Sequence, residues 1–444
     1  MWAWSAALNG PYHFDDYVTP LGDPASRSLM AWGQHLTVTL RPVAKLSYAL
    51  EAATGWSDEP GPRRAVSIAL HGMAAALFLV LTHRLSPGTT PLGAAFLAAL
   101  WFIHPVHADS VLMLSGRPAV LSGLFLLAAL LSLERARPWL AASLFMLACL
   151  SRETALAGLL PLAVLAVSRP GATFRSSLRE FAPALLGGAL VVAWILTTPR
   201  YLHLAEFSFL GRPFWGSLAA QIGAVPVGLG LLINPSALSI DYGIPLPPRW
   251  TEPLFMLGAV CYLVAGAGAV LLLRRSRAAA VGLAIWLASL LPTQSVVPKL
   301  DALTNRPLSL ALLGLLLAAS PVLAVAIRRF RASRTGPAGG NRRDLRNAAP
   351  PLAAAYCALA LLLLLTTATL DRGQLFRSEL SLWRDAARKS RTNARPHLQY
   401  ALLLHNAGQF AEARDALSVA RRIDPFSSDI ALFSRLQRHD EVVP

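Results

Sequence analysis

Three stretches of about twenty residues without a charged side chain constrain this chain more than any other feature. They are residues 253–273, 307–327 and 351–370. An α-helix of ~20 apolar residues is long enough to cross the hydrocarbon core of a bilayer. Charged residues make up 14% of the chain, against roughly 25% in soluble domains. The sequence therefore predicts an all-α protein, a polytopic bundle of transmembrane helices.

Other apolar windows bring the expected number of spans to about ten. They lie near residues 66–83, 91–107, 110–131, 139–150, 154–168, 181–198 and 279–292. The arginines collect in the gaps around residues 84, 135–137, 169–179, 274–277 and 328–346. Short basic gaps between spans are typical of cytoplasmic loops, so we place all of them in the cytoplasm. The net charge of +16 then reflects loop arginines, and we expect no nucleic-acid partner.

This orientation decides how the remaining segments cross. Residues 137 and 169 lie on the same side of the membrane only if the segment 139–168 crosses it twice or re-enters it. The apolar run of this segment is interrupted at Ser151-Arg152-Glu153. By the same parity, 221–234 is interfacial or re-entrant rather than a full span. Residues 1–65 and everything after 371 lie outside, so we expect a first transmembrane helix to precede Met1. The alternative is an N-terminus that is translocated without a preceding span. We predict an N-terminal external loop (1–65), a transmembrane domain (66–370) and an external C-terminal domain (371–444).

Most of the unusual ionisable residues fall on the external side. Ionisable groups at membrane depth are costly and suggest function, and here they end different spans, so one cavity could gather them. The candidate site residues are Asp15, Asp16, Arg41, His104, His107, Arg117, Arg152, Glu153, Asp241 and Arg306.

Each group has a catalytic and a structural interpretation. Asp15 and Asp16 could supply a general base for an acceptor hydroxyl, or cap a helix or turn. His104 and His107 could share a metal, but no third ligand is evident. We therefore name no metal site, favour capping or hydrogen bonding into the cavity, and leave a divalent cation open as a cofactor.

The arginines are the candidates for binding a phosphate. A guanidinium binds phosphate oxygens bidentately and stays charged, which suits Arg117, Arg152 and Arg306. The alternative is snorkelling to the interface, or, for Arg152, an internal ion pair with Glu153. Cys149, Cys261 and Cys357 lie inside apolar blocks and form no disulfide or metal pattern.

The last 74 residues change character and become charged and amphipathic. Residues 393–425 follow the 34-residue tetratricopeptide pattern, with Gly408 at the turn and Pro425 as terminator. His397 stands at the early tryptophan position. Because one repeat cannot bury its own faces, we expect it to pack with 371–390 and 427–438 or on the membrane domain.

These motifs, in this order, resemble a known family. The pattern runs FDD, RP, HPVH, GR, a charged hairpin, NP…DY and a late arginine, and FIHPVHADSVLMLSGRPAVLSGLFLL (102–127) is its most specific part. It is similar to the TMTC family, the transmembrane and tetratricopeptide-repeat protein O-mannosyltransferases of the GT-C superfamily. The similarity extends from Phe14 to Pro425.

The resemblance implies a GT-C fold of about eleven helices, a polyprenyl- or dolichyl-phosphate sugar donor and inverting transfer outside the cytoplasm. It implies catalytic roles for Asp15 and Asp16, and family positions at His104, His107 and Arg117. Asn305 and Leu308 depart from the family, which carries an acid and a tyrosine around Arg306.

We therefore expect a membrane glycosyltransferase that moves a sugar, with mannose favoured, from a polyprenyl-phosphate donor to an external hydroxyl on a protein or glycan. Its active face and repeat would be periplasmic (in a bacterial inner membrane) or lumenal. Membrane lipids, and a protein on the repeat, are further expected partners. The alternatives are a non-catalytic scaffold that displays the repeat, and a transporter, which needs ionisable groups near the membrane midplane.

Overall fold

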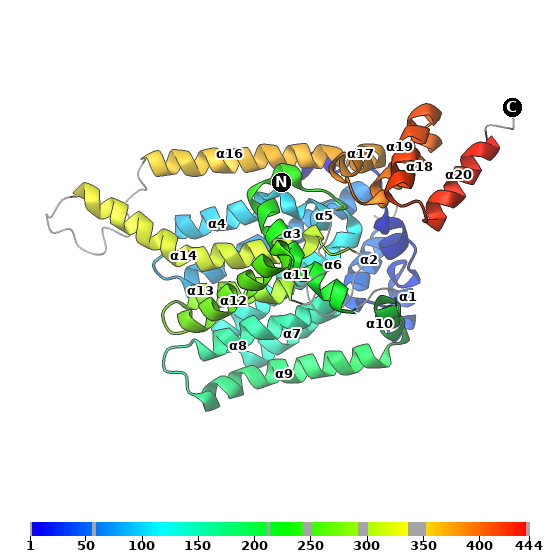
Figure 1. The fold of residues 1–444 in the computed structure, drawn as a ribbon. Helices are drawn as coiled ribbons and strands as arrows, with labels where there is room; N and C mark the ends of the chain where they lie inside the picture. The colour runs from blue at the N-terminus through cyan, green and yellow to red at the C-terminus, as the bar shows by residue number, and fades with distance from the viewer. Residues whose placement is uncertain are drawn as a thin grey trace.

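The computed structural model describes residues 2–55, 59–210, 214–242, 251–291, 301–335 and 352–440. Within these ranges every regular element is helical, and the long helices lie side by side (Figure 1). The prediction of an all-α polytopic membrane protein is confirmed.

Six of the expected spans are long helices. They are α3 (Pro60–Leu85), α6 (Arg117–Glu134), α9 (Phe174–Thr197), α12 (Pro253–Leu272), α14 (Asn305–Thr335) and α16 (Leu352–Leu375). The window at 91–107 forms a broken span, because α4 (Pro91–Ile103) ends just before His104 and the chain bends by 47° into η4 (Pro105–His107) and α5 (Ala108–Val111). Pro105 causes the break, since proline cannot continue the hydrogen-bond ladder of α4.

Three expected spans are short helices. They are α7 (Pro138–Ser151), α8 (Leu159–Val167, preceded by η6, Glu153–Gly158) and α13 (Arg277–Leu290). At 1.5 Å per residue, α7 is about 21 Å long, against ~30 Å of hydrocarbon. The α7–α8 pair is the hairpin expected from the parity argument, because Arg169 after α8 donates to the carbonyl of Leu133 before α7.

Two helices between α9 and α12 differ from the sequence expectation. α10 (Pro199–Leu210) was not foreseen, and α11 (Phe214–Ile233) begins seven residues earlier than the expected segment. α11 is long and apolar enough to cross a membrane, whereas the sequence predicts an interfacial or re-entrant segment there. Ile222 touches Gly258 in the second turn of α12, and Gly228 touches Leu308 in the first turn of α14. α11 also shares a hydrophobic core with Tyr262 and Ala265, farther along α12, and with Leu312 of α14.

The segments between the long helices separate into two ends of the bundle. One end, here the polar end, carries η1 (Trp2–Ala7), η2 (Tyr17–Leu21), η3 (Pro24–Ser26), α1 (Leu29–Gln34), α2 (Pro42–Ala53), η5 (Leu114–Gly116) and η7 (Pro235–Ala237). The other end, the basic end, carries the arginine-rich turns at 84–90, 169–173 and 274–276. The polar and basic segments were assigned to opposite sides from sequence, and they lie at opposite ends.

The C-terminal residues form a small helical array at the polar end (Figure 1). Its helices are α17 (Glu379–Lys389), α18 (Ala394–Asn406), α19 (Phe410–Ile423) and α20 (Ser428–Asp440). Gly408 turns the chain with φ +75°, as the tetratricopeptide pattern requires. Ala401, Leu404, Leu417 and other apolar residues bury one shared core.

Candidate functional site

A recess beneath the polar end collects side chains from five parts of the chain. It is lined from α3, the α4–α6 segment, the turn of the hairpin, α13 and the start of α14. Polar groups in the lining are His71, His107, Ser110, Ser122, Arg152, Thr154, Ser289, Arg306 and Ser309. Three of these, His107, Arg152 and Arg306, were singled out from sequence. The remaining walls are apolar.

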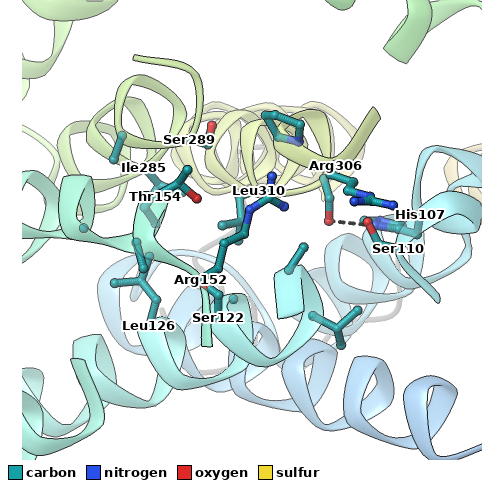
Figure 2. A pocket seen from close by; sticks show the side chains of 18 of the residues that line it. His107, Ser110, Ser122, Leu126, Arg152, Thr154, Ile285, Ser289, Arg306 and Leu310 are labelled. Carbon is teal, nitrogen blue, oxygen red and sulfur yellow. Dashed lines mark hydrogen bonds between the residues drawn. The ribbon is translucent and has the colours of Figure 1, made fainter. Parts of the chain in front are cut away.

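Arg152 reaches into the recess from the turn of the hairpin, toward the helix that carries Arg306 and Leu310 (Figure 2). Its Nε is buried without a hydrogen-bond partner. No hydrogen bond or ion pair of its guanidinium is found among the described residues. The internal ion pair with Glu153 that sequence left open does not form, because Glu153 binds another arginine.

That other arginine is Arg41, which precedes α2. Its Nε and Nη2 donate to the two carboxylate oxygens of Glu153 at 3.0 and 2.7 Å. Arg41 adopts a left-handed backbone conformation, φ 57°, which is uncommon for a residue with a Cβ. The hydroxyl of Tyr201 in α10 accepts from its backbone N–H at 3.1 Å. Arg41 and Glu153 thus fasten the N-terminal segment to the hairpin and leave Arg152 unneutralised.

Arg306 borders the recess on the other side. Its Nη2 lies 3.6 Å from a carboxylate oxygen of Asp15 and donates to the hydroxyl of Ser115 at 3.2 Å. The Asp15 side chain is 47% exposed, so it can reach a molecule that enters from outside. Asp15 therefore contacts Arg306 near the surface, and Arg306 lines the recess together with Arg152.

Asp16 is buried and differs from its neighbour. One of its carboxylate oxygens accepts from the backbone N–H of Ser115 at 2.7 Å, and the other from that of His13 at 3.2 Å. Because Ser115 in turn binds Arg306, Asp16 holds the partner of an arginine in the recess. Its geometry is that of a positioning carboxylate.

The two histidines have separate partners. His107 shares a 2.8 Å hydrogen bond with the hydroxyl of Ser309, the dashed line in Figure 2. His104 accepts from the N–H of Val106 through Nδ1 and lies 3.0 Å from the carbonyl of Leu232 through Nε2. His104 therefore caps the break after α4. Within the described ranges, no three His, Cys, Asp or Glu side chains are grouped so that they could hold a metal.

Arg117 points away from the recess into a second buried cluster. It pairs with Glu51 at 2.6 Å and donates to Ser67 at 3.0 Å and to the carbonyl of Arg63 at 2.6 Å. Arg63 binds the other carboxylate oxygen of Glu51 at 2.9 Å. With these partners the guanidinium of Arg117, which is fully buried, is not available to a ligand.

Asp241 joins the bundle to the C-terminal array. Its carboxylate accepts from Arg395 at 2.6 Å and from Asn393 at 2.9 Å, both at the start of α18. Arg395 also pairs with Asp301 at 2.7 Å. Burial works against the charge of Arg395, but these two carboxylates raise its pKa above the ordinary value. Asp241 is thus a docking residue, separate from the recess.

Sequence reasoning missed Asp109 and Arg372, and it noted Asn305 only as a departure from the family. Asn305 donates to Asp109 at 2.6 Å, and Arg372 pairs with Asp109 at 3.4 Å and with Asp385 at 3.0 Å. Asp109 lies inside the 102–127 stretch but was not singled out, and Arg372 follows an apolar span, where an isolated arginine suggests an internal partner.

The fold and the site define a class of protein, a multi-pass helical membrane protein with an arginine-lined recess at one end. Within that class, the chain is similar to the protein O-mannosyl-transferase Tmtc2 of Drosophila melanogaster, with 29% identity over 263 residues. The match covers 54% of this chain and 26% of the fly protein, so the chain spans about a quarter of that relative. No family model matches the chain, and no solved structure matches it.

Proposed function

We propose that this protein is a glycosyltransferase that moves a sugar, with mannose favoured, from a polyprenyl-phosphate donor to an acceptor hydroxyl. The observation that carries the proposal is the half-buried guanidinium of Arg152, whose Nε is buried without a hydrogen-bond partner and which pairs with no carboxylate among the described residues, in a recess that also contains Arg306. A cation that is partly withdrawn from water without a paired carboxylate favours an anionic ligand, and a phosphate is the anion that guanidinium groups recognise best. The similarity to an O-mannosyltransferase supports the sugar and the reaction class.

The reaction needs a base on one side of the sugar and cations on the other. Asp15 takes the proton of the acceptor hydroxyl, and the hydroxyl oxygen forms a bond with the anomeric carbon. The bond between that carbon and the phosphate oxygen breaks, and the lipid phosphate leaves with both electrons of the bond. Arg152 and Arg306 stabilise its growing charge. A single displacement of this kind inverts the anomeric centre.

Asp16 does not act as a second base in this proposal, because its two oxygens already accept backbone hydrogen bonds. Arg41, Glu153, His104 and Arg117 likewise act through the structure around the recess, and Asp241 acts through the docking of the C-terminal array. Residues 1–65 supply the base, 66–370 the recess and 371–444 the array beside it. The polar end is extracytoplasmic, and the acceptor is a protein Ser or Thr, or a glycan.

The recess must open to receive a sugar phosphate. Its free volume is about 40 Å³, room for a few water molecules. The Arg306–Asp15 contact at its mouth is long and partly exposed. Exposed ion pairs contribute only ~0–1 kcal/mol to stability, so this contact is easily broken. A donor phosphate can therefore take Arg306 from Asp15, which frees the carboxylate to act as base.

The test is mannosyl transfer from a polyprenyl-phosphate donor by membranes that contain the chain. We expect Arg152→Gln and Asp15→Asn each to lower the rate by about 100-fold or more, as for the loss of one group that stabilises a developing charge or of a general base. Arg152→Lys should recover part of the activity, since lysine restores the positive charge but not the bidentate hydrogen bonding of a guanidinium.

The matched controls are Arg179→Gln and Asp429→Asn, which change exposed side chains far from the recess. Both should transfer at the normal rate. Unchanged turnover in Arg152→Gln or Asp15→Asn would overturn the assignment. If no donor supports transfer and the substitutions matter only for binding of a protein to α17–α20, the scaffold interpretation replaces it.

A further inference from the structure

A second arginine pocket lies at the opposite end of the bundle from the proposed site. It has a volume of about 470 Å³ and is lined by the turns after α3, α8 and α12 and by the later part of α14. Five arginines line it, at positions 169, 274, 275, 277 and 328. Four segments that are far apart in the sequence thus bring their cations to one place.

The charges in this pocket are only partly compensated. Arg169 pairs with Glu180 at 3.0 Å, and Arg277 pairs with Glu134 at 2.5 Å. Arg274, Arg275 and Arg328 have no ion pair within the described part of the chain. The pocket therefore carries an excess of positive charge, which favours an anion.

Arg328 of α14 reaches across to the turn after α3. A Cβ on Gly88 would lie 3.3 Å from Nη2 of Arg328 and 3.5 Å from its Cζ, so the guanidinium rests directly against the glycine backbone. Nε of Arg328 donates to the carbonyl of Ala324 at 3.2 Å. These contacts hold Arg328 over the pocket, whereas an arginine that only marks a loop needs no such fit.

The surroundings favour a lipid headgroup over a soluble anion. The pocket lies where the apolar helices α3, α8, α12 and α14 end or begin, which is the level of the headgroups in a bilayer. Val167 and Val325 line it and remain 44% and 38% exposed. An anionic phospholipid can place its phosphate among the arginines and its acyl chains along these side chains.

We propose that this pocket binds the phosphate headgroup of an anionic phospholipid. It is a binding site separate from the recess and independent of the proposed transferase activity. Basic pockets between transmembrane helices on the arginine-rich side bind such headgroups by the same chemistry.

The experiment uses the full chain in nanodiscs of phosphatidylcholine with a small fraction of phosphatidylglycerol. The amount of phosphatidylglycerol retained after detergent extraction is measured by native mass spectrometry across a titration. We expect the double variant Arg274→Gln/Arg328→Gln to bind it about 30-fold more weakly, roughly fivefold for each arginine removed. The control, Arg135→Gln/Arg137→Gln, removes two exposed arginines from the same end outside the pocket and should bind normally.

Three results would overturn the proposal. Equal loss in both double variants would mean that the whole basic end attracts lipid without a pocket. Equal retention in both would mean that the pocket binds no headgroup. If millimolar inorganic phosphate displaced the phosphatidylglycerol, and phosphate alone protected the protein against heat denaturation, the pocket would be assigned to a soluble anion. Loss of transferase activity is not part of the readout, so failure of one proposal leaves the other intact.

Discussion

Glu51 lies between two arginines at the end of α2. It pairs with Arg117 and with Arg63, and the three side chains are almost completely buried. The ring of Tyr48 lies 4.7 Å from the guanidinium of Arg117. Removing one member of a buried ion cluster leaves the others charged and without solvent, a cost of about 3–5 kcal/mol.

We predict that Glu51→Gln destabilises the protein by about that amount. The measurement is the temperature at which the detergent-solubilised protein loses its monodisperse peak. Glu412→Gln, at an exposed position in α19, is the control and should melt like the native chain. A Glu51→Gln protein with unchanged heat resistance would contradict the ion cluster.

At this scale the sequence identifies which residues are unusual but not what they contact. Arg152 and Arg306 were chosen because they interrupt or flank apolar runs, and both line the recess. Arg117 was chosen on the same ground, yet its charge is satisfied internally. The difference depends on Glu51, which lies 66 positions earlier in the chain and carries no local signal. Only the packing of α2 against α6 brings them together.

At the scale of elements, helices α13 and α14 cross at two glycines, where their backbones are in direct contact. A Cβ on Gly282 would lie 2.5 Å from the carbonyl oxygen of Gly314, and one on Gly314 would lie 2.5 Å from that of Gly282. Small residues at a helix crossing allow backbones to touch, which is a main source of helix association in membranes. These helices also carry Ser289 and Arg306 of the recess.

Gly282→Leu should therefore push α13 away from α14. We expect a loss of stability of about 1–3 kcal/mol or more, as for other overpacked cores, and a matching loss of activity because the wall of the recess moves. Gly266→Leu in α12 is the control, since a Cβ there meets nothing within 4 Å. Heat resistance in detergent and transfer rate are measured for both. A Gly282→Leu protein that matches its control in both assays would show that the crossing is looser than described.

At the level of elements the sequence was most informative where apolar runs are long. The window 139–150 corresponds to α7 (Pro138–Ser151), and the hairpin followed from counting sides. α10 was missed because it mixes apolar residues with Arg200, His203 and Glu206 and gives no continuous apolar run. The early start of α11 gives a weak signal because Gly216 and Ser217 interrupt the apolar run of its first two turns.

The whole molecule has a polar end and a basic end, and the arrangement predicts opposite exposure of the two. We replace the native cysteines by alanine and introduce a single cysteine at Arg135 or at Ser427, both outside the bundle core. In sealed cells or right-side-out vesicles, a membrane-impermeant maleimide should label Ser427→Cys and not Arg135→Cys, because arginine-rich loops stay in the cytoplasm. Labelling of Arg135→Cys alone would invert the proposed sidedness and exclude an external active face. Labelling of both from outside would contradict the placement of the two ends on opposite sides of the membrane.

The docking of the C-terminal array could be anticipated only in part. One repeat needs partners, so some packing was expected. Asp241 and Asp301, which anchor the array, lie in loops whose paths are set by the tertiary structure and carry no local signal.

The departure at Asn305 has a structural explanation here. Its amide donates to Asp109 at 2.6 Å and to the carbonyl of Ser239 at 2.7 Å, two contacts that an acid could not make.

The short hairpin of α7 and α8 has a consequence for how the protein is made. Its turn carries Arg152 and Glu153, and α7 reaches only about two-thirds of the way through the hydrocarbon layer. Neither half is a stable span alone, so the two must enter the membrane together as one unit. Arg41, the partner of Glu153, is synthesised about 110 residues before it and is already available. Arg41 is thus synthesised before Glu153, the carboxylate that it neutralises. If the first 53 residues were separated from the rest, the hairpin would have to insert without Arg41.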